Sequence, residues 1–131
     1  MTEQWKVIEE FPRYEVSNLG NVRSNIGVQK LLQPYATAKG YLTVRLSKKP
    51  ANKGSYNSQD MKVHRLVAAY FCENYDESKE IHHINHDKTD NSAVNLLCLT
   101  KKEHLELHRR EKLQLEEEMA AAENTAAAIA I

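Results

Sequence analysis

The chain of 131 residues has no long apolar run, and no stretch approaches the roughly 20 residues needed to cross a bilayer. Its first ten residues, MTEQWKVIEE, lack the basic and apolar regions of a secretory signal peptide. From these two absences we expect a cytoplasmic protein with no membrane partner. The remaining composition, 41% apolar and 27% charged, is ordinary for a globular domain with a real core.

Cysteine is scarce, and the two residues present do not form a C-x-x-C pair. Cys72 lies in AAYFCENY and Cys98 in NLLCLT, both of which are apolar segments. We therefore expect two buried free thiols rather than a disulfide or a cysteine metal site.

The chain also carries no net charge, because 18 basic residues balance 18 acidic ones. The distribution is uneven, however: residues 1–72 carry eleven Lys and Arg against five Asp and Glu. A basic first half is compatible with binding nucleic acid, but such an excess is also common on solvated surfaces. Charge alone therefore does not decide the partner.

The first half of the chain predicts an antiparallel sheet built from short strands. WKVI, YEVS and NVRS are brief β-forming segments, and NLGN supplies a turn between the last two. Residues 41–47, YLTVRLS, alternate so that Leu42, Val44 and Leu46 share one side, and MKV is the expected partner strand. The sheet should have one apolar and one polar face.

The second half predicts helices and a strand pair, which makes the fold class α+β. Residues 63–71 carry apolar side chains at the spacing of an amphipathic helix. KEIHHI and LLCLT read as two strands around a polar loop. Thr100 followed by Glu103 has the form of a capping box, so we expect a helix from residue 101 to about 123.

Five of the six histidines lie between residues 82 and 108. His82 and His83 should point to opposite sides of their strand, whereas His104 and His108, four apart, share one helix face. An H-x-x-x-H pair alone is weak support for a metal site, because such histidines are usually surface or core groups. With a third imidazole from the facing strand, it has the ligand number of a catalytic metal site with an open position.

The segment IHHINHDKTDNSAVNLLCLTKKEHLELH resembles the HNH nuclease motif, whose fold is the ββα-metal unit. That motif has an Asp-His or His-His pair, an Asn-Leu about a dozen residues on, and a histidine or asparagine early in the helix. VHRLVAAYF resembles the segment before the motif in phage and intron homing endonucleases. WKVIEEFPRYEVSNLGNVRS is similar to the N-terminal nuclease-associated modular DNA-binding motif of those enzymes.

The resemblance implies roles for five residues. His82, His104 and His108 would bind one divalent metal ion, and His83 would be the general base. Asn95 would hold the loop so that the imidazole of His83 points at the attacking water. His86 has no role in the pattern and is expected at the surface. Homing members often have aspartate and asparagine at the positions of His82 and His104 and tend to use magnesium. The all-imidazole set favours zinc, nickel, cobalt or manganese instead.

The expected reaction is metal-dependent hydrolysis of DNA phosphodiester bonds with 5′-phosphate and 3′-hydroxyl products. The expected partner is double-stranded DNA, and the protein is a monomer or a homodimer in a bacterial or phage-infected cell. The residues expected to contact DNA are Lys39, Arg45, Lys48, Lys49 and Arg65. Two alternatives stay open: a non-catalytic DNA-binding module with a structural metal, and a metal-dependent hydrolase of another substrate.

The expected domain division has three parts. Residues 1–60 form a β-rich DNA-binding region, residues 61–112 form the HNH nuclease domain, and residues 113–131 form a helical or disordered tail. The tail, which ends in ENTAAAIAI, is of low complexity and receives no function.

Overall fold

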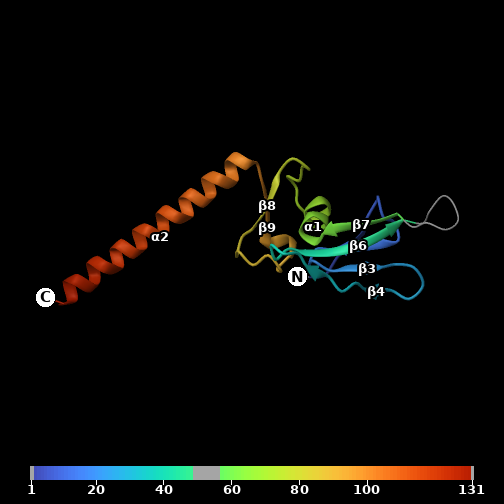
Figure 1. Cartoon of the computed structure of the whole chain (residues 1–131), viewed down its shortest axis with the longest axis horizontal. Helices are drawn as coiled ribbons and strands as arrows, with labels where there is room; N and C mark the ends of the chain where they lie inside the picture. Colours follow the sequence, from blue (N-terminus) through green and yellow to red (C-terminus); the bar gives the residue numbers. More distant parts are fainter. Residues whose placement is uncertain (1, 49–56, 131) are drawn as a thin grey trace. The chain divides into compact units, whose positions relative to one another are not determined.

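The computed structural model describes residues 2–48 and 57–130, with side chains up to residue 122. The chain divides into two compact units, Met1–Cys98 and Leu99–Ile131. The first unit holds nearly all of the β-structure and one helix, and the second consists mainly of one helix (Figure 1). The α+β class predicted from the sequence is confirmed. The predicted boundaries at residues 60 and 112 stay predictions.

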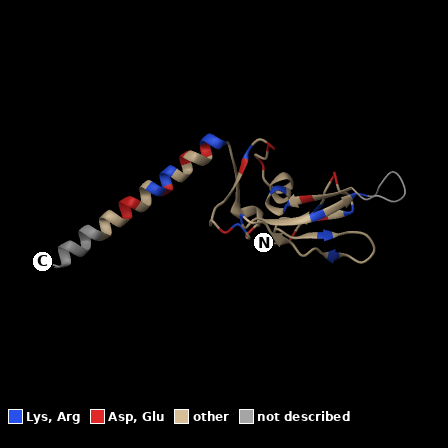
Figure 2. Cartoon of the chain, viewed as in Figure 1, with Lys and Arg blue, Asp and Glu red and all other residues tan. Residues whose placement is uncertain are grey.

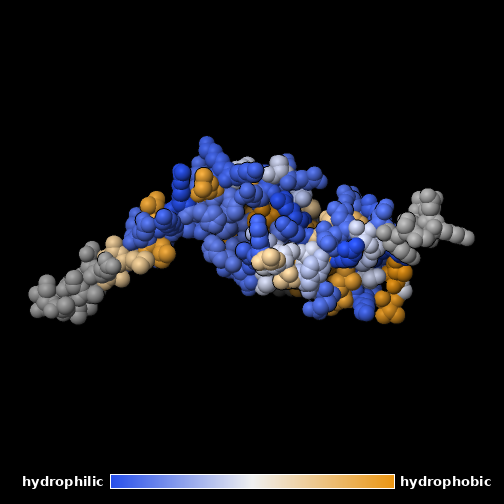
Figure 3. Space-filling model, in the orientation of Figure 1, coloured by the Kyte–Doolittle hydropathy of each residue, from blue (hydrophilic) through white to orange (hydrophobic). Residues whose placement is uncertain are grey.

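The N-terminal sheet has four antiparallel strands in chain order. These are β1 (Trp5–Val7), β2 (Tyr14–Ser17), β3 (Val22–Ser24) and β4 (Lys30–Leu31). The turn between β2 and β3 contains Gly20 at φ +90°, a backbone conformation that residues with a Cβ rarely adopt. Figure 3 shows a mainly hydrophilic face with an apolar patch near β4, where Ile26, Val28 and Leu31 are exposed.

A second antiparallel sheet follows, with β5 (Tyr35–Ala36), β6 (Leu42–Lys48) and β7 (Asn57–Lys62). Val44 and Leu46 are buried on β6 and Arg45 is exposed, which confirms the predicted alternation. Thr43 is buried too, so both sides of β6 are covered at that position. In Figure 2, ribbon segments coloured for Lys and Arg lie along β3, β4 and β6.

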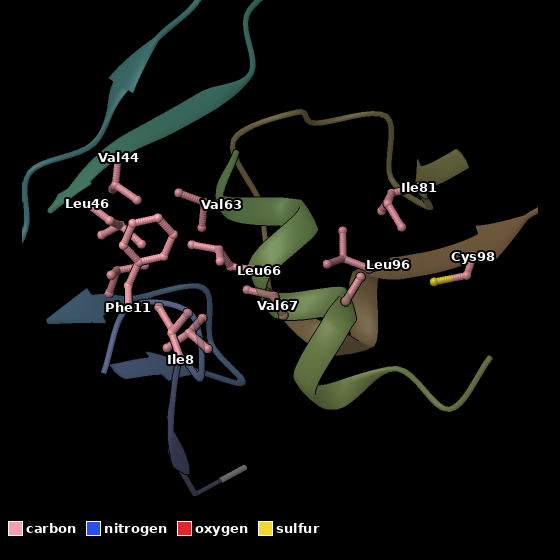
Figure 4. Packing of buried hydrophobic residues seen from close by; sticks show 13 residues of the cluster. Ile8, Phe11, Val44, Leu46, Val63, Leu66, Val67, Ile81, Leu96 and Cys98 are labelled. Atoms are coloured by element: carbon pink, nitrogen blue, oxygen red, sulfur yellow. The ribbon is translucent and has the colours of Figure 1, made fainter. Parts of the chain in front are cut away.

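The core forms around α1 (Val63–Phe71), which starts directly after β7. Val63, Leu66 and Val67 are buried, as the helical spacing predicted. On one side of α1 the core includes Phe11, between β1 and β2, and Leu46 of β6 (Figure 4). Ile81 and Leu96, from the next strand pair, lie on the other side, so α1 joins the two parts of this unit.

That strand pair consists of β8 (Glu80–His83) and β9 (Leu96–Leu99), with a short 3₁₀ helix, η1 (Ala93–Asn95), just before β9. The loop from residue 84 to residue 92 therefore connects the end of β8 to η1. The amide of Ile84 donates to the carbonyl oxygen of Asn95 at 2.8 Å, which closes the base of this loop.

The second unit contains α2 (Lys101–Ala130). The predicted capping box is confirmed: the amide of Glu103 donates to Thr100 Oγ1, and the amide of Thr100 donates to a Glu103 carboxylate oxygen, both at 3.1 Å. The helix extends beyond the predicted end at residue 123. No helix within the described residues has the length and apolar character required to cross a bilayer.

Candidate functional site

The two neighbouring histidines of β8 have different surroundings. Successive side chains of a strand point to opposite sides, and both imidazoles are only 5% exposed. The ring of His82 lies 5.4 Å from that of His86, measured between centroids. The ring of His83 lies 5.4 Å from His64 and 6.2 Å from Tyr41. Each side of the strand therefore offers one imidazole to a separate environment, as the sequence predicted.

His83 is fixed by a buried hydrogen bond to Asn91. Its Nε2 lies 2.8 Å from Oδ1 of Asn91. With Oδ1 as the acceptor, Nε2 carries the proton and the lone pair of the neutral ring lies on Nδ1. The buried side-chain polar atoms without a partner, within the described residues, are Thr43 Oγ1, His64 Nδ1 and Asn91 Nδ2. Nδ1 of His83 is not among them, and within the described residues no hydrogen bond to it is found.

Asn91 was not predicted from the sequence, and it is held by the turn between β2 and β3. A Cβ built on Gly20 would lie 3.0 Å from the carbonyl carbon and oxygen of Asn91, so the two backbones are in close contact. The amide of Ala93 also donates to the carbonyl oxygen of Asn18 at 2.7 Å. The N-terminal sheet therefore supports the segment that positions the partner of His83.

Asn95 fixes the loop instead of contacting His83. Its Oδ1 accepts from the amide of Asn85 at 3.0 Å. Its Nδ2 donates to Oδ1 of Asn85 and to the carbonyl oxygen of Asp90, both at 2.9 Å. These three hydrogen bonds hold the loop after β8 closed. These contacts are compatible with the expected role of Asn95 in holding the loop. That role stays a proposal.

His64 on α1 is a second buried imidazole beside His83, and the sequence analysis gave it no role. It is 6% exposed, and its ring lies 5.0 Å from that of Tyr41. Burial, and secondarily the neighbouring His83, lowers the pKa of His64 to about 3. The ring is therefore neutral near pH 7. Its spacing of three from Val67 and of seven from Phe71, both on the apolar stripe of α1, is the sequence signal that could have identified it as buried.

His104 and His108 lie one turn apart at the start of α2, as their spacing predicted. Their Nε2 atoms are 3.0 Å apart. Two ligand nitrogens around one tetrahedral zinc ion lie about 3.3 Å apart, given metal–nitrogen distances of about 2.0 Å. The donor pair therefore fits a divalent ion. Nδ1 of His108 lies 3.7 Å from a carboxylate oxygen of Glu111, which is longer than a hydrogen bond.

The predicted DNA-binding residues near β6 do not form one patch. Lys39 precedes the strand and Lys48 ends it, and seven residues at about 3.3 Å each separate those ends by about 20 Å. The guanidinium of exposed Arg45 lies 3.4 Å from the carboxylate of Asp60, which offsets its charge. Lys48 extends its ammonium over the ring of Phe11, 5.1 Å from the centroid. Of these three predicted residues, Lys39 alone lies at the Tyr41 end of the strand.

The other two predicted DNA-binding residues, like the three near β6, stay predictions. Arg65, on α1, lines a pocket of about 210 Å³ that also contains the glutamates Glu9, Glu10 and Glu77. A phosphate in that pocket would meet carboxylates as well as the guanidinium. Lys49 lies outside the described residues.

The two cysteines are free thiols, as expected. Cys98 is buried and Cys72 is half-buried. Burial, together with the neighbouring Cys98, raises the pKa of the Cys72 thiol to about 11. Because a thiol and not a thiolate is present near neutral pH, Cys72 is a weak nucleophile and a weak metal ligand.

Comparison with known proteins finds a family match in each half of the chain. Residues 3–47 match the NUMOD4 motif, and residues 61–106 match the HNH endonuclease family. An uncharacterized HNH endonuclease of Acanthamoeba polyphaga mimivirus is 41% identical over 109 residues, which are 80% of this chain and 26% of the relative. The DNA endonuclease I-HmuI of Bacillus phage SP01 is 36% identical over 104 residues, which are 79% of this chain and 56% of the relative.

A third relative, the H-N-H endonuclease F-TflII of Escherichia phage T5, is 31% identical, covering 78% of this chain and 50% of its own. The chain thus spans from about a quarter to a little over half of these curated relatives. A solved structure of the HNH homing endonuclease I-HmuI, described as DNA binding and cleavage by that enzyme, has a TM-score of 0.69 at 30% identity. The likeness covers 92% of this chain and 68% of that one. With the NUMOD4 motif at residues 3–47, the HNH endonuclease match at residues 61–106 and the likeness to the I-HmuI structure, the chain belongs to the HNH endonuclease family.

Proposed function

We propose that this protein is a metal-dependent endonuclease that hydrolyses phosphodiester bonds of double-stranded DNA. The observation that carries the proposal is the state of His83: a buried imidazole whose Nε2 is hydrogen-bonded to Asn91, which leaves the lone pair of the neutral ring on Nδ1. A general base needs a fixed ring and an available lone pair, and this arrangement supplies both. The names of the relatives, DNA endonuclease and HNH endonuclease, support the same substrate.

In this proposal, Nδ1 of His83 accepts a proton from the water that attacks phosphorus. Asn91 keeps the proton of the resting ring on Nε2, so that Nδ1 remains the accepting atom. Asn95 holds the loop after β8 in place while the ring changes its charge. Attack by this water and departure of the 3′ oxygen leave 5′-phosphate and 3′-hydroxyl ends.

We propose that His104 and His108 bind a divalent ion and that His82 is the third ligand. The match to the HNH endonuclease family, residues 61–106, contains both His82 and His104. When bound, the ion supplies Lewis-acid stabilisation of the phosphate and of the leaving oxygen. Imidazole ligands suit zinc, nickel, cobalt or manganese better than they suit magnesium. The place of action follows the phage relatives: the cytoplasm of a bacterial or phage-infected cell.

The test is cleavage of supercoiled plasmid DNA with a panel of divalent ions, with EDTA as the control. Nicked or linear plasmid should form in at least one ion, disappear in EDTA, and be nearly absent with His83→Ala. Mapping the cut ends should give 5′-phosphates. Binding of DNA without cleavage in every ion would contradict the proposal and identify a non-catalytic DNA-binding module instead.

A further inference from the structure

Tyr41 is the point at which two lysines approach the surroundings of His83. Its half-buried ring contacts the imidazole of His64 at 5.0 Å and lies 6.2 Å from that of His83. The ammonium of Lys88 lies 4.8 Å from the centroid of the same ring, and that of Lys62 lies 5.4 Å from it. The two ammonium groups are therefore no further apart than the sum of those distances. Neither lysine was predicted from the sequence to bind DNA.

The two lysines come from separate segments and are held in place. Lys62 ends β7 immediately before α1, and Lys88 lies in the loop after β8. The ammonium of Lys88 donates to the carbonyl oxygen of Lys39 at 2.8 Å. Its aliphatic stem passes Gly40, where an added Cβ would lie 3.6 Å from Cδ of Lys88, and Gly40 has φ +88°. The tight turn before Tyr41 thus presents both the ring and the carbonyl that position Lys88.

The charges of these lysines are not neutralised. Within the described residues neither ammonium has a carboxylate partner, whereas Arg23 pairs with Glu15 and Arg45 with Asp60. A ring quadrupole attracts an ammonium without cancelling its charge, so both cations can still bind an anion. Two like charges held near one ring repel each other, and a bound anion removes that cost.

We propose that Lys62 and Lys88, gathered on Tyr41, bind backbone phosphate of the DNA strand and place it against His83. This inference rests on the proposed function, because it names the contact that brings the substrate to that base. Ammonium groups are point charges that bind phosphate without reading sequence. The contact therefore positions the strand, and any sequence preference is set elsewhere.

The first experiment measures binding of a fluorescein-labelled mixed-sequence duplex by anisotropy, from low to high salt, in a His83→Ala background. Lys62→Gln and Lys88→Gln should each weaken binding, and each should lower the slope of log affinity against log salt by about one. Lys62→Arg and Lys88→Arg, which keep the charge, should retain the slope. Lys79→Gln is the matched control, because the ammonium of Lys79 also donates to a backbone carbonyl, that of Asn74, at 3.0 Å.

The second experiment places the contact on the DNA. The plasmid cut is mapped, and duplexes of that sequence are made with one neutral methylphosphonate beside the cut. Replacing a lysine, and replacing the phosphate that it contacts by a methylphosphonate, should each weaken binding. The two changes together should weaken binding no more than either change alone. Additive losses at every phosphate beside the cut would overturn the placement of the strand against His83.

The results separate this inference from the proposed function. If the wild-type protein cleaves DNA but Lys62→Gln and Lys88→Gln bind like Lys79→Gln, the lysine site is wrong and the endonuclease stands. If the wild-type protein cleaves in no ion, the proposed function fails, and the binding slopes still report on the lysines. Thermal unfolding of each variant, and the lysine-to-arginine pairs, show whether a loss of binding comes from a lost charge or a lost fold.

Discussion

His83 and the pair His104–His108 differ in how the protein holds an imidazole. His83 is buried, and its neighbours come from the turn before β6, from α1 and from the loop after β8. The pair on α2 is more exposed, and its geometry follows from the rise of one helical turn. A proton acceptor needs one fixed orientation and therefore several neighbours, whereas two metal ligands four residues apart converge through the helix alone.

The largest effect should come from His83→Ala. If His83 is the base, single-turnover cleavage should fall by about 100- to 10,000-fold, the usual contribution of a positioned general base. The variant should keep its metal ion and its DNA affinity, because the ligands and the lysines are unchanged. His82→Ala is the matched comparison from the same strand and should lose metal instead. The reverse pattern of metal loss would show that the two sides of β8 are misassigned.

Next in size is the loss of a ligand from the helical pair. His104→Ala should weaken metal affinity, measured by calorimetry, by more than about 100-fold, the upper range for the loss of an outer partner. Glu111→Gln keeps both imidazoles and should cost less, because its carboxylate lies 3.7 Å from Nδ1 of His108. Unchanged metal content in His104→Ala would exclude this histidine as a ligand.

Substitution of Asn91 tests the support of the proposed base, His83, while leaving that residue unchanged. Asn91→Ala leaves Nε2 of His83 without its acceptor, and a lost buried hydrogen bond costs about 1–3 kcal/mol. We expect a lower melting temperature, and roughly tenfold slower cleavage because the imidazole of His83 is no longer held in one orientation and tautomer. Asn91→Asp keeps an acceptor and removes the unpartnered Nδ2, so it should cleave better than Asn91→Ala. Equal losses in both variants would remove the hydrogen bond as the cause.

The last prediction is an effect of pH on stability rather than on cleavage, through His64. Its pKa falls from 6.5 to about 3 on folding, so the unfolded chain binds more protons between those values. The free energy of unfolding should therefore decrease as the pH falls from about 6.5 towards 3. His64→Phe keeps an aromatic ring and should show a flatter dependence by thermal unfolding between pH 7 and 4.5. Parallel curves for both proteins would mean that His64 titrates normally.

The local parts of this molecule were predictable from the sequence, and the contacts between distant segments were not. The bounds of α1, the capping box of α2 and the spacing of His104 and His108 each depend on residues within a few positions. The surroundings of His83 depend on residues up to 42 positions away, since Tyr41 lies near His83. No periodicity encodes such a contact. The family resemblance supplied the expected role of His83, and the structure showed its hydrogen-bond partner, Asn91.

The close contact of Gly20 with Asn91 makes the two matched segments of this chain depend on each other. The glycine belongs to the NUMOD4 motif and the asparagine to the HNH endonuclease match. Replacing residues 3–47 with another segment would remove the turn against which the loop after β8 folds. The new segment would preserve the position of Asn91 only if it supplied a matching turn, with a glycine at the place of Gly20.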